Sequence, residues 1–302
     1  TLAQTVRMVL SLGLSGVPYT GADVGGFGGN PTPELFVRWF QAASFMPFFR
    51  VHSAWFVGRR EPWRFDDATQ AVLADTLRTR ARLMPYLYTL AASAHRTGHP
   101  LCRPIGWPDS PDPAAWAVDH EFLLGDAILV APVLEPGATT REVILPAGRW
   151  HLLWDDAAAF DGPGTVTVPA PADRIPVLVR AGSVVPMNED GRTVLHVWPP
   201  ADPGGAAASR PERAAETSGP DCAAGASGPE GGGDLYSDAG DGWGAWRVDR
   251  FRVRRTGPAT CEVTRTGAGD FPLPDGGFAI RIRGVSPPPP LVEGGAFERI
   301  EV

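Results

Sequence analysis

Gly21-Ala-Asp-Val-Gly-Gly-Phe-Gly-Gly29 is the most informative stretch of this sequence. It follows a short strand-like segment, residues 13–20, and precedes an amphipathic segment for which Thr32 is a natural N-cap residue. An acidic residue directly after a parallel strand stands where α/β folds bind their ligands, and the glycines let a ligand approach the backbone closely. Asp23 is therefore a candidate binding residue. A tight turn in which Asp23 bonds its own backbone would give the same pattern.

The same order of segments occurs a second time. Residues 45–51 form a mostly apolar run, as expected of a parallel strand covered on both faces, and Arg50-Val-His-Ser53 follows at its end. A long helix is predicted over residues 67–98, with a kink at Pro85. Strand, loop and helix in repeated succession are typical of a (β/α) barrel or an open α/β sheet.

After about residue 112 the pattern changes to short apolar runs separated by Gly and Pro turns. Runs of this kind predict the strands of a β-sandwich, and they cover residues 122–124, 127–132, 141–145, 150–154, 165–168, 175–179 and 183–185. Residues 199–233 contain no Val, Ile, Leu, Phe, Trp or Tyr, which predicts a disordered Ala/Gly/Pro-rich insertion. The expected domains are a barrel portion over residues 1–112, a proximal β-sandwich over 113–198 and a distal β domain over 234–302.

The composition excludes several functions. All 27 basic residues among the 302 are arginine, so a Schiff-base lysine, a phosphate-binding Walker lysine and a Ser-Lys dyad are impossible. The net charge of −7 argues against binding to nucleic acid or to an anionic membrane. The one basic run, Arg250-Phe-Arg-Val-Arg-Arg255, alternates with apolar residues and predicts a strand with one charged face.

Neither a metal centre nor a membrane segment is predicted. Cys102, Cys222 and Cys261 are odd in number and widely spaced, which argues against a disulfide framework and for a reducing, cytoplasmic compartment. His95 and His99 lack an acidic third ligand for zinc, and no apolar run approaches the ~18 residues that a membrane span needs. We expect no cofactor.

Arg50, His52 and the aromatic residues near them are further candidates. Arg50 can neutralise and orient Asp23, and His52 offers a neutral hydrogen-bond donor to a sugar hydroxyl. A structural histidine at a strand end would look the same in the sequence. Loops after consecutive parallel strands share one face of the fold, however, which favours a common site. Trp55 and Trp63 could stack on a sugar or belong to the core.

A series of longer motifs runs along the chain in a fixed order. They are Gly16-Val-Pro18, Gly21-Ala-Asp-Val-Gly-Gly-Phe27, Glu34-Leu-x-x-Arg-Trp-x-Gln41, Phe45-x-Pro-Phe-Phe-Arg-x-His-Ser53, Glu61-Pro-Trp63, Arg82-x-x-Pro-Tyr-Leu-Tyr88, Arg103-Pro104, Phe122–Val133, Leu145-Pro-x-Gly-x-Trp150, Pro176–Ser183 and Tyr236-Ser-Asp-Ala-Gly-Asp241. The series resembles glycoside hydrolase family 31, whose best-known members are retaining α-glucosidases. The resemblance implies the C-terminal part of a (β/α)8 TIM barrel followed by two β-sandwich-like domains.

By this resemblance, Asp23 and His52 match residues that hydrogen-bond the sugar in the cleavage subsite, and Phe27 matches an aromatic residue that lines it. Arg50 matches a supporting arginine, and its pairing with Asp23 is our own inference. The family's two catalytic aspartate motifs, of the Asp-Met-Asn-Glu and Gly-Asp-Asn kinds, do not occur in the sequence. A complete barrel also takes roughly 250 residues. We expect a C-terminal piece of a larger enzyme, with both catalytic carboxylates upstream of Thr1.

The predicted function is part of a retaining, exo-acting α-glucosidase that hydrolyses terminal α-glucosidic bonds of oligosaccharides. This piece would supply sugar-binding residues but neither the nucleophile nor the acid/base. α-Xylosidase and sulfoquinovosidase members of the family share these motifs, so another specificity is an alternative. A non-catalytic carbohydrate-binding piece is a second alternative. An oligosaccharide is the expected partner, and the sequence indicates no oligomeric state.

Overall fold

The computed structural model describes residues 1–108, 110–201, 230–240, 242–257, 260–285 and 289–301. It divides into two compact units, which we describe separately. The first consists of residues 1–81, 98–146 and 165–177, and the second consists of residues 82–97, 147–164 and 178–302. Most of the helices come early in the chain and most of the strands come late, as the sequence predicts.

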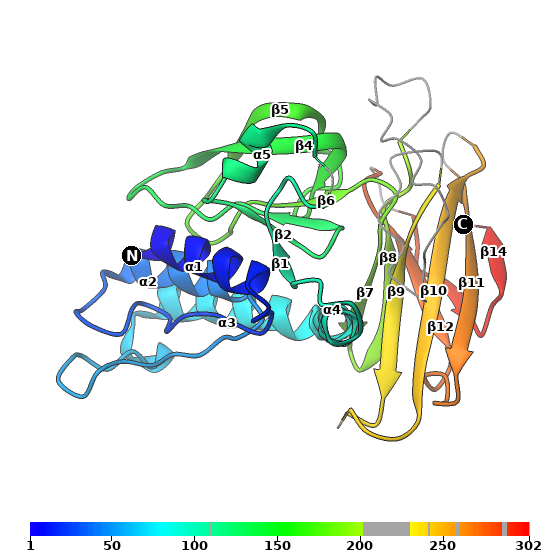
Figure 1. The fold of residues 1–302 in the computed structure, drawn as a ribbon, viewed down its shortest axis with the longest axis horizontal. Coiled ribbons are helices and arrows are strands. Elements are labelled where there is room, and N and C mark those ends of the chain that lie inside the picture. The colour runs from blue at the N-terminus through cyan, green and yellow to red at the C-terminus, as the bar shows by residue number, and fades with distance from the viewer. Residues whose placement is uncertain (109, 202–229, 241, 258–259, 286–288, 302) are drawn as a thin grey trace. The chain divides into compact units, whose positions relative to one another are not determined.

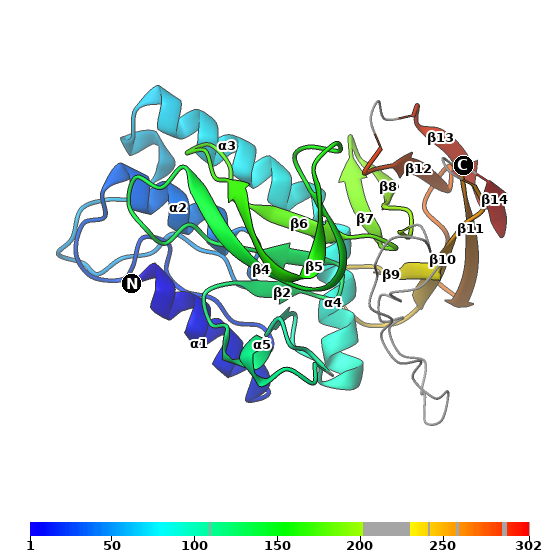
Figure 2. The same ribbon diagram turned by 90° about the horizontal axis from the view of Figure 1, so that it is seen from above.

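Three helices form most of the helical part of the first unit, namely α1 (Leu2–Leu14), α2 (Pro33–Ala43) and α3 (Asp67–Arg82). Two further helices are short, η1 (Pro62–Arg64) and α5 (Pro113–Ala117). Figure 2 shows α2 between α1 and α3. Thr32 caps α2 as predicted, because its Oγ1 accepts a hydrogen bond from the backbone N–H of Leu35 at 3.2 Å. Phe36, Trp39 and Phe40 of α2 are buried in the core.

The two barrel strands predicted over residues 13–20 and 45–51 are not continuous strands. Their loops meet in a single parallel bridge between Asp23 and Arg50. The parallel direction agrees with the prediction, but the predicted length is wrong. Each of the two segments contains a proline, which has no N–H group to donate to a strand ladder.

The long helix predicted over residues 67–98 is two helices. α3 ends at Arg82, and α4 (Met84–Thr97) begins after Leu83. Pro85 is the second residue of α4 and not a kink inside one helix. Proline fits the first turn of a helix, where the backbone N–H has no intrahelical acceptor, so Pro85 starts a new helix.

Short strands form a six-stranded sheet with the order β1-β2-β3-β6-β4-β5. Its members are β1 (Cys102–Arg103), β2 (Phe122–Leu124), β3 (Ile128–Val130), β4 (Thr140–Leu152), β5 (Ala159–Pro169) and β6 (Val177–Arg180). The β1–β2, β2–β3 and β4–β6 pairs are antiparallel. The apolar runs predicted as strands between residues 122 and 179 correspond to these elements, although the runs at 141–145 and 150–154 belong to one strand, β4. The predicted run at 183–185 lies in a strand of another sheet.

The second unit contains a sandwich of two four-stranded sheets (Figure 1). One sheet has the order β14-β11-β10-β9 and consists of β9 (Glu230–Asp238), β10 (Trp246–Arg255), β11 (Cys261–Gly269) and β14 (Arg299–Glu301). The other has the order β13-β12-β8-β7 and consists of β7 (Val184–Glu189), β8 (Arg192–Val197), β12 (Phe278–Ile282) and β13 (Val292–Gly295). Neighbouring strands are antiparallel except β8 and β12, which are parallel.

The core of this sandwich groups β7 and β8 with the C-terminal strands. Val184 and Leu195 pack in one buried cluster with Phe251 and Ile280. The domain boundary expected at residue 198 therefore differs from the observed packing, which joins strands on both sides of it. The pairing of β8 with β12 links segments far apart in the chain, so neither segment reveals it alone.

Residues 230–233 are part of β9, although they were expected to belong to the insertion. A Cβ atom at Gly231 would lie 2.0 Å from the carbonyl oxygen of Gly182, and the N–H of Gly232 donates to that same oxygen at 2.7 Å. The backbones approach too closely for a side chain, so position 231 requires glycine. In the sequence this glycine looks like part of the Ala/Gly/Pro-rich segment, which is why it was assigned to the insertion. The rest of the predicted insertion, residues 202–229, lies outside the described residues.

Two arginines, the buried Arg38 and the partly buried Arg80, hold the helices of the first unit to neighbouring backbone. Arg38 of α2 donates at 2.7–3.3 Å to the carbonyl oxygens of Ala138, Ala170, Pro171 and Arg174. Arg80 of α3 donates at 2.7–2.8 Å to those of Ser44, Met46 and Pro47. Arg80 therefore fixes the segment that leads to Arg50.

Candidate functional site

The glycine-rich loop begins at Gly21, where another backbone segment passes very close. A Cβ atom at this position would lie 2.0 Å from the carbonyl oxygen of Phe48, so a side chain does not fit without a shift. Further along the loop, the N–H of Val24 donates to the carbonyl of Arg50 at 3.0 Å, beside the bridge between Asp23 and Arg50. The two loops are therefore joined side by side through their main chains.

Asp23 and Arg50 also pair through their side chains. Arg50 Nε donates to Asp23 Oδ1 at 2.7 Å, which is the partnership inferred from the sequence. The side chain of Asp23 is 17% exposed and that of Arg50 is 51% exposed. The guanidinium also lies over the ring of Phe48, 5.4 Å from its centroid. The carboxylate is thus held from one side, near the surface of the unit.

Phe27 and His52 lie ring beside ring. Their centroids are 5.7 Å apart with an angle of 36° between the planes, and both side chains are exposed. The carbonyl of Phe27 accepts a hydrogen bond from the N–H of Ala54 at 2.8 Å. Together with Asp23 and Arg50, the predicted binding residues therefore lie on two adjoining loops. Their contact with a sugar stays a prediction.

Arg60 is a candidate that the sequence reasoning missed. It is 3% exposed, and its guanidinium donates to the carbonyls of Gly29 and His52, the latter at 3.3 Å. Burial lowers the pKa of Arg60, and the nearby carboxylate of Asp23 acts in the opposite direction. Little in the sequence indicates this role, because Arg60 stands next to Arg59 in a polar segment that resembles a solvated loop.

The loop between His52 and Arg60 presents large apolar side chains to solvent. Trp55 and Phe56 are 93% and 95% exposed. The N–H of Gly58 donates to Oδ1 of Asn30 at 2.8 Å, which ties the loop to the glycine-rich segment just after these aromatic residues. Exposed aromatic faces beside polar groups suit a ligand that has both apolar and hydroxyl surfaces.

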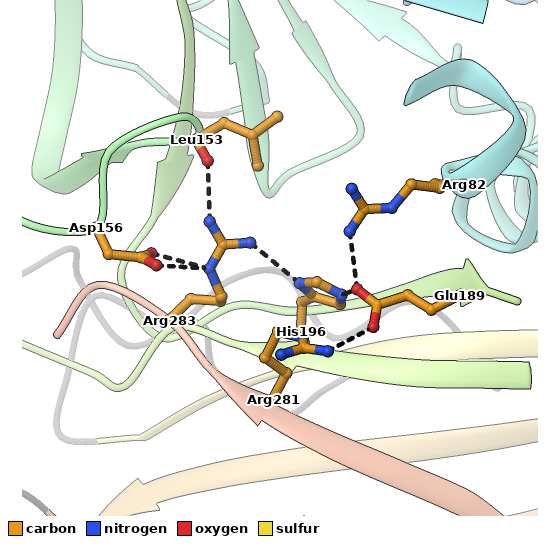
Figure 3. A network of polar contacts seen from close by, with 7 residues as sticks. All are labelled: Arg82, Leu153, Asp156, Glu189, His196, Arg281 and Arg283. Atoms are coloured by element: carbon orange, nitrogen blue, oxygen red, sulfur yellow. Dashed lines mark hydrogen bonds and ion pairs between the residues drawn. The ribbon is translucent and has the colours of Figure 1, made fainter. Parts of the chain in front are cut away.

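A second polar cluster, in the other unit, surrounds Glu189 (Figure 3). Glu189 Oε1 accepts hydrogen bonds from Arg82 at 2.8 Å and from His196 Nε2 at 2.9 Å, and Oε2 accepts one from Arg281 at 2.6 Å. The bonds from His196 and Arg281 hold the pKa of Glu189 well below its usual range. Protein donors therefore occupy both carboxylate oxygens.

His196 is fully buried between Glu189 and Arg283 in the same cluster (Figure 3). A guanidinium can only donate, so Nδ1 of His196 accepts from Arg283 at 3.3 Å and the ring proton is on Nε2. Burial lowers the pKa of His196, which favours this neutral form. Arg283 also donates to Asp156 at 2.8 Å and to the carbonyl of Leu153 at 3.0 Å. We assign this cluster a structural role, because its groups bind one another.

The motif at residues 236–241 also has a structural explanation. The carboxylate of Asp238 accepts hydrogen bonds from the hydroxyls of Tyr88 at 2.8 Å and Tyr236 at 3.0 Å, and from the N–H of Gly240 at 2.7 Å. The backbone N–H of Tyr236 donates to Thr89 Oγ1 at 2.9 Å. Tyr88 and Asp238 belong to two of the motifs noted in the sequence, one on α4 and one on β9. The bond between them holds this helix to this strand.

In the described part of the chain, no group of three His, Cys, Asp or Glu residues is arranged to hold a metal ion. No helix within the described ranges combines the length and apolar character that a membrane crossing requires. Cys102 and Cys261 are buried and have free thiols.

Two models of one protein family match consecutive parts of the chain. The model described as "Glycosyl hydrolases family 31 TIM-barrel domain" matches residues 1–90. The model described as "Glycosyl hydrolase family 31 C-terminal domain" matches residues 98–185. The first match contains Asp23, Phe27, Arg50, His52 and Arg60, and the second contains strands β1 to β6.

Curated relatives with alpha-glucosidase names are similar over the same part of the chain. A probable alpha-glucosidase of Oryza sativa subsp. japonica is 44% identical over 198 residues, which are 65% of this chain and 22% of the relative. Neutral alpha-glucosidase C of Mus musculus is 43% identical over 188 residues, which are 61% of this chain and 21% of the relative. The chain thus spans about a fifth of the length of these relatives.

Solved structures resemble nearly the whole chain. The alpha subunit of glucosidase II has a TM-score of 0.74 at 26% identity, over 93% of this chain and 30% of that one. A glycoside hydrolase family 31 dextranase of Flavobacterium johnsoniae, complexed with glucose, has a TM-score of 0.74 at 24% identity, over 93% of this chain and 34% of that one, and shows the fold alone. The predicted TIM-barrel region followed by β domains is confirmed.

Proposed function

The chain belongs to glycoside hydrolase family 31, and on that premise we propose that it forms part of a retaining, exo-acting α-glucosidase. The proposed substrates are oligosaccharides with terminal α-glucosidic bonds. Relatives named as alpha-glucosidases, at 43–44% identity, support this choice. Because the chain spans about a fifth of those relatives, the activity is proposed for the full-length protein.

The pairing of Asp23 with Arg50 is the observation that carries the proposal. Arg50 binds Oδ1 of the carboxylate at 2.7 Å, and we propose that Oδ2 accepts a hydrogen bond from a sugar hydroxyl. His52 adds a group that both donates and accepts, and the exposed ring of Phe27 adds an apolar surface beside it. These groups together fit the alternating polar and apolar surface of a glucosyl ring.

The catalytic carboxylates are proposed to come from outside residues 1–302. Retaining hydrolysis uses two carboxyl groups about 5–5.5 Å apart, one as nucleophile and one as acid/base. Asp23 is bound by a guanidinium, which suits a hydrogen-bond acceptor better than a proton donor. We therefore assign Asp23 to binding and no residue of the chain to either catalytic role.

Substitution of His52 tests the site. In the full-length protein, His52→Ala should lower kcat/KM for an aryl α-glucoside about 1,000-fold, or roughly 4 kcal/mol, because hydroxyl contacts made in the transition state are lost. His95→Ala is a matched control, because His95 is an exposed histidine of α4. Wild-type kinetics in His52→Ala would contradict the assignment of His52 to the sugar site.

A substrate panel tests the specificity. We expect the wild-type full-length protein to cleave the α-glucoside faster than the matching α-xyloside and α-sulfoquinovoside. A preference for either of the others identifies a different specificity of the family. Sugar binding without cleavage of any of the three identifies a carbohydrate-binding protein.

We also propose a reducing, cytoplasmic compartment as the location. Cys102 and Cys261 are buried with free thiols, and burial raises the pKa of Cys261 to about 11, so this thiol stays protonated. Free buried thiols are typical of proteins that fold without disulfides. Subcellular fractionation of the native host tests this, and recovery outside the cytoplasm contradicts it.

A further inference from the structure

Arg60 reaches both loops of the proposed sugar site from a buried position. The residue is 3% exposed, whereas its neighbour Arg59 is exposed to solvent. One guanidinium nitrogen donates to the carbonyl of Gly29, in the glycine-rich loop, and the other donates to the carbonyl of His52 at 3.3 Å. A single planar group thus holds the backbones of two loops.

The chemistry of the guanidinium suits this arrangement, because its N–H donors point in fixed directions from one plane. Both acceptors of Arg60 are main-chain carbonyls, so the bonds fix the course of each loop. Main-chain hydrogen bonds join the same loops elsewhere, from Val24 to Arg50 at 3.0 Å and from Ala54 to Phe27 at 2.8 Å. Arg60 adds a side-chain link at His52 itself.

The charge of Arg60 also acts on Asp23. The two attract each other, as the opposing effect of Asp23 on the pKa of Arg60 shows. Asp23 therefore lies in the field of two cations, its direct partner Arg50 and the buried Arg60. Because Arg60 is buried, water and salt screen its charge less than they screen the charge of the half-exposed Arg50.

We propose that Arg60 is a positioning residue of the sugar site, which holds the carbonyls of Gly29 and His52 and so sets the distance between His52 and Asp23. The inference rests on the proposed function, and Arg60 acts through the two loops without touching the sugar. A misplacement of about 1 Å in an active site can lower the rate about 100-fold. Loosened loops should therefore reduce kcat more than they weaken substrate binding.

Arg38 provides a matched control, because it has the same chemistry in a different place. It is buried and donates to four backbone carbonyls, which belong to residues 138–174. Burial lowers the pKa of Arg38 as it lowers that of Arg60. Substitution should cost folding stability at both positions, but the Arg38 acceptors lie outside the site loops. Arg59 controls for the loss of one positive charge.

The experiment compares Arg60→Lys, Arg60→Ala, Arg38→Lys and Arg59→Ala in the full-length protein, with kcat, KM and melting temperature for each. For an aryl α-glucoside, Arg60→Ala should lower kcat about 100-fold with KM changed by no more than about threefold. Arg60→Lys should lower kcat about 10-fold, because an ammonium group does not span both carbonyls. Arg38→Lys should lower the melting temperature similarly but keep kcat within about twofold, and Arg59→Ala should change neither.

Hydrogen exchange gives a readout that does not need activity. Arg60→Lys should speed the exchange of backbone amides in residues 22–28 and 50–58, whereas Arg38→Lys should not. Arg60→Lys with wild-type kcat, or a kcat loss in Arg38→Lys as large as in Arg60→Lys, overturns the proposal. A wild-type protein that cleaves no α-glycoside contradicts the proposed function. Exchange alone then decides on Arg60, and unchanged exchange in both loops overturns its positioning role.

Discussion

The loops around Asp23 and the cluster around Glu189 both bring arginine to a carboxylate, with opposite results. In the loops, Arg50 pairs with one oxygen of Asp23, and Arg60 donates to backbone carbonyls instead. In the cluster, two arginines and a histidine occupy both oxygens of Glu189. The first arrangement binds one carboxylate oxygen to arginine, which fits the proposed ligand role of Asp23, and the second binds both oxygens to protein donors.

The difference lies in where the guanidinium groups find their acceptors. The sequence has no lysine, so all 27 of its basic side chains are arginines. Each carries a guanidinium with five N–H donors in a fixed fork. Arginine N–H groups that donate to backbone carbonyls fix the course of a loop without neutralising a carboxylate. Donors bound to a carboxylate neutralise it and hold the strands that carry it. The same residue type thus shapes the loops of the proposed binding site in one unit and builds a structural centre in the other.

The largest expected effect separates Glu189 from Asp23. Glu189→Ala removes an acceptor shared by two arginines and His196, so we expect the free energy of unfolding to fall by about 3 kcal/mol. Asp23→Ala leaves the half-exposed Arg50 to water and should cost less than about 1 kcal/mol. Urea unfolding of the full-length variants measures both. Equal losses at the two positions would break the comparison.

A third carboxylate sharpens the comparison, because it is fully buried and its arginine lies further away than those of Asp23 and Glu189. Glu121 is fully buried, accepts a hydrogen bond from the N–H of Ile144 at 2.9 Å and lies 3.7 Å from Arg141. Burial raises the pKa of Glu121 from 4.5 to about 7. Between these pH values the folded protein keeps a proton that the unfolded chain loses. The free energy of unfolding should therefore fall by about 3 kcal/mol as the pH rises through this window.

Glu121→Gln should abolish that slope, as measured by urea unfolding at several pH values within the window. Glu189 has the opposite sign, because its pKa lies below the usual range. Its contribution to stability is present above the ordinary pKa of 4.5 and is lost as the pH falls towards the folded pKa. A Glu121→Gln variant that keeps the wild-type slope contradicts this explanation.

The smallest expected effect tests the close backbone contact beneath the site loops. Gly21→Ala would place a methyl group 2.0 Å from the carbonyl oxygen of Phe48, so the backbone must move. We expect a loss of about 1–3 kcal/mol in thermal unfolding. Gly28→Ala is the control, because nothing lies within 4 Å of a Cβ there, and it should change stability by less than about 0.5 kcal/mol. Equal stability of the two variants would mean that the loops are held less closely.

Structural features that depend on residues close together in the sequence could be predicted from it. Thr32 caps α2, and the run from Arg250 to Arg255 alternates as predicted, with Phe251 and Val253 buried. The adjoining position of the site loops was also predictable, because α/β topology brings the ends of successive parallel strands to one face.

Structural features that depend on contacts with backbone far away in the sequence could not be predicted. The acceptors of Arg60 are carbonyls, which every residue carries, so no side-chain pattern marks Gly29 or His52 as its partners. Gly231 resembled low-complexity sequence because the backbone of Gly182, which excludes a side chain there, lies far away in the sequence. The sandwich boundary was misplaced for the same reason.

The parallel pairing of β8 with β12 has a consequence for the order in which the protein folds. Val194 lies opposite Ala279, and β12 is an inner strand of its sheet. The β7–β8 hairpin can form early, but its neighbour does not exist until the chain through Ile282 has been synthesised. Contacts between such distant segments form slowly. On the ribosome, the hairpin therefore waits with an unpaired edge, which is the state that chaperones and proteases recognise.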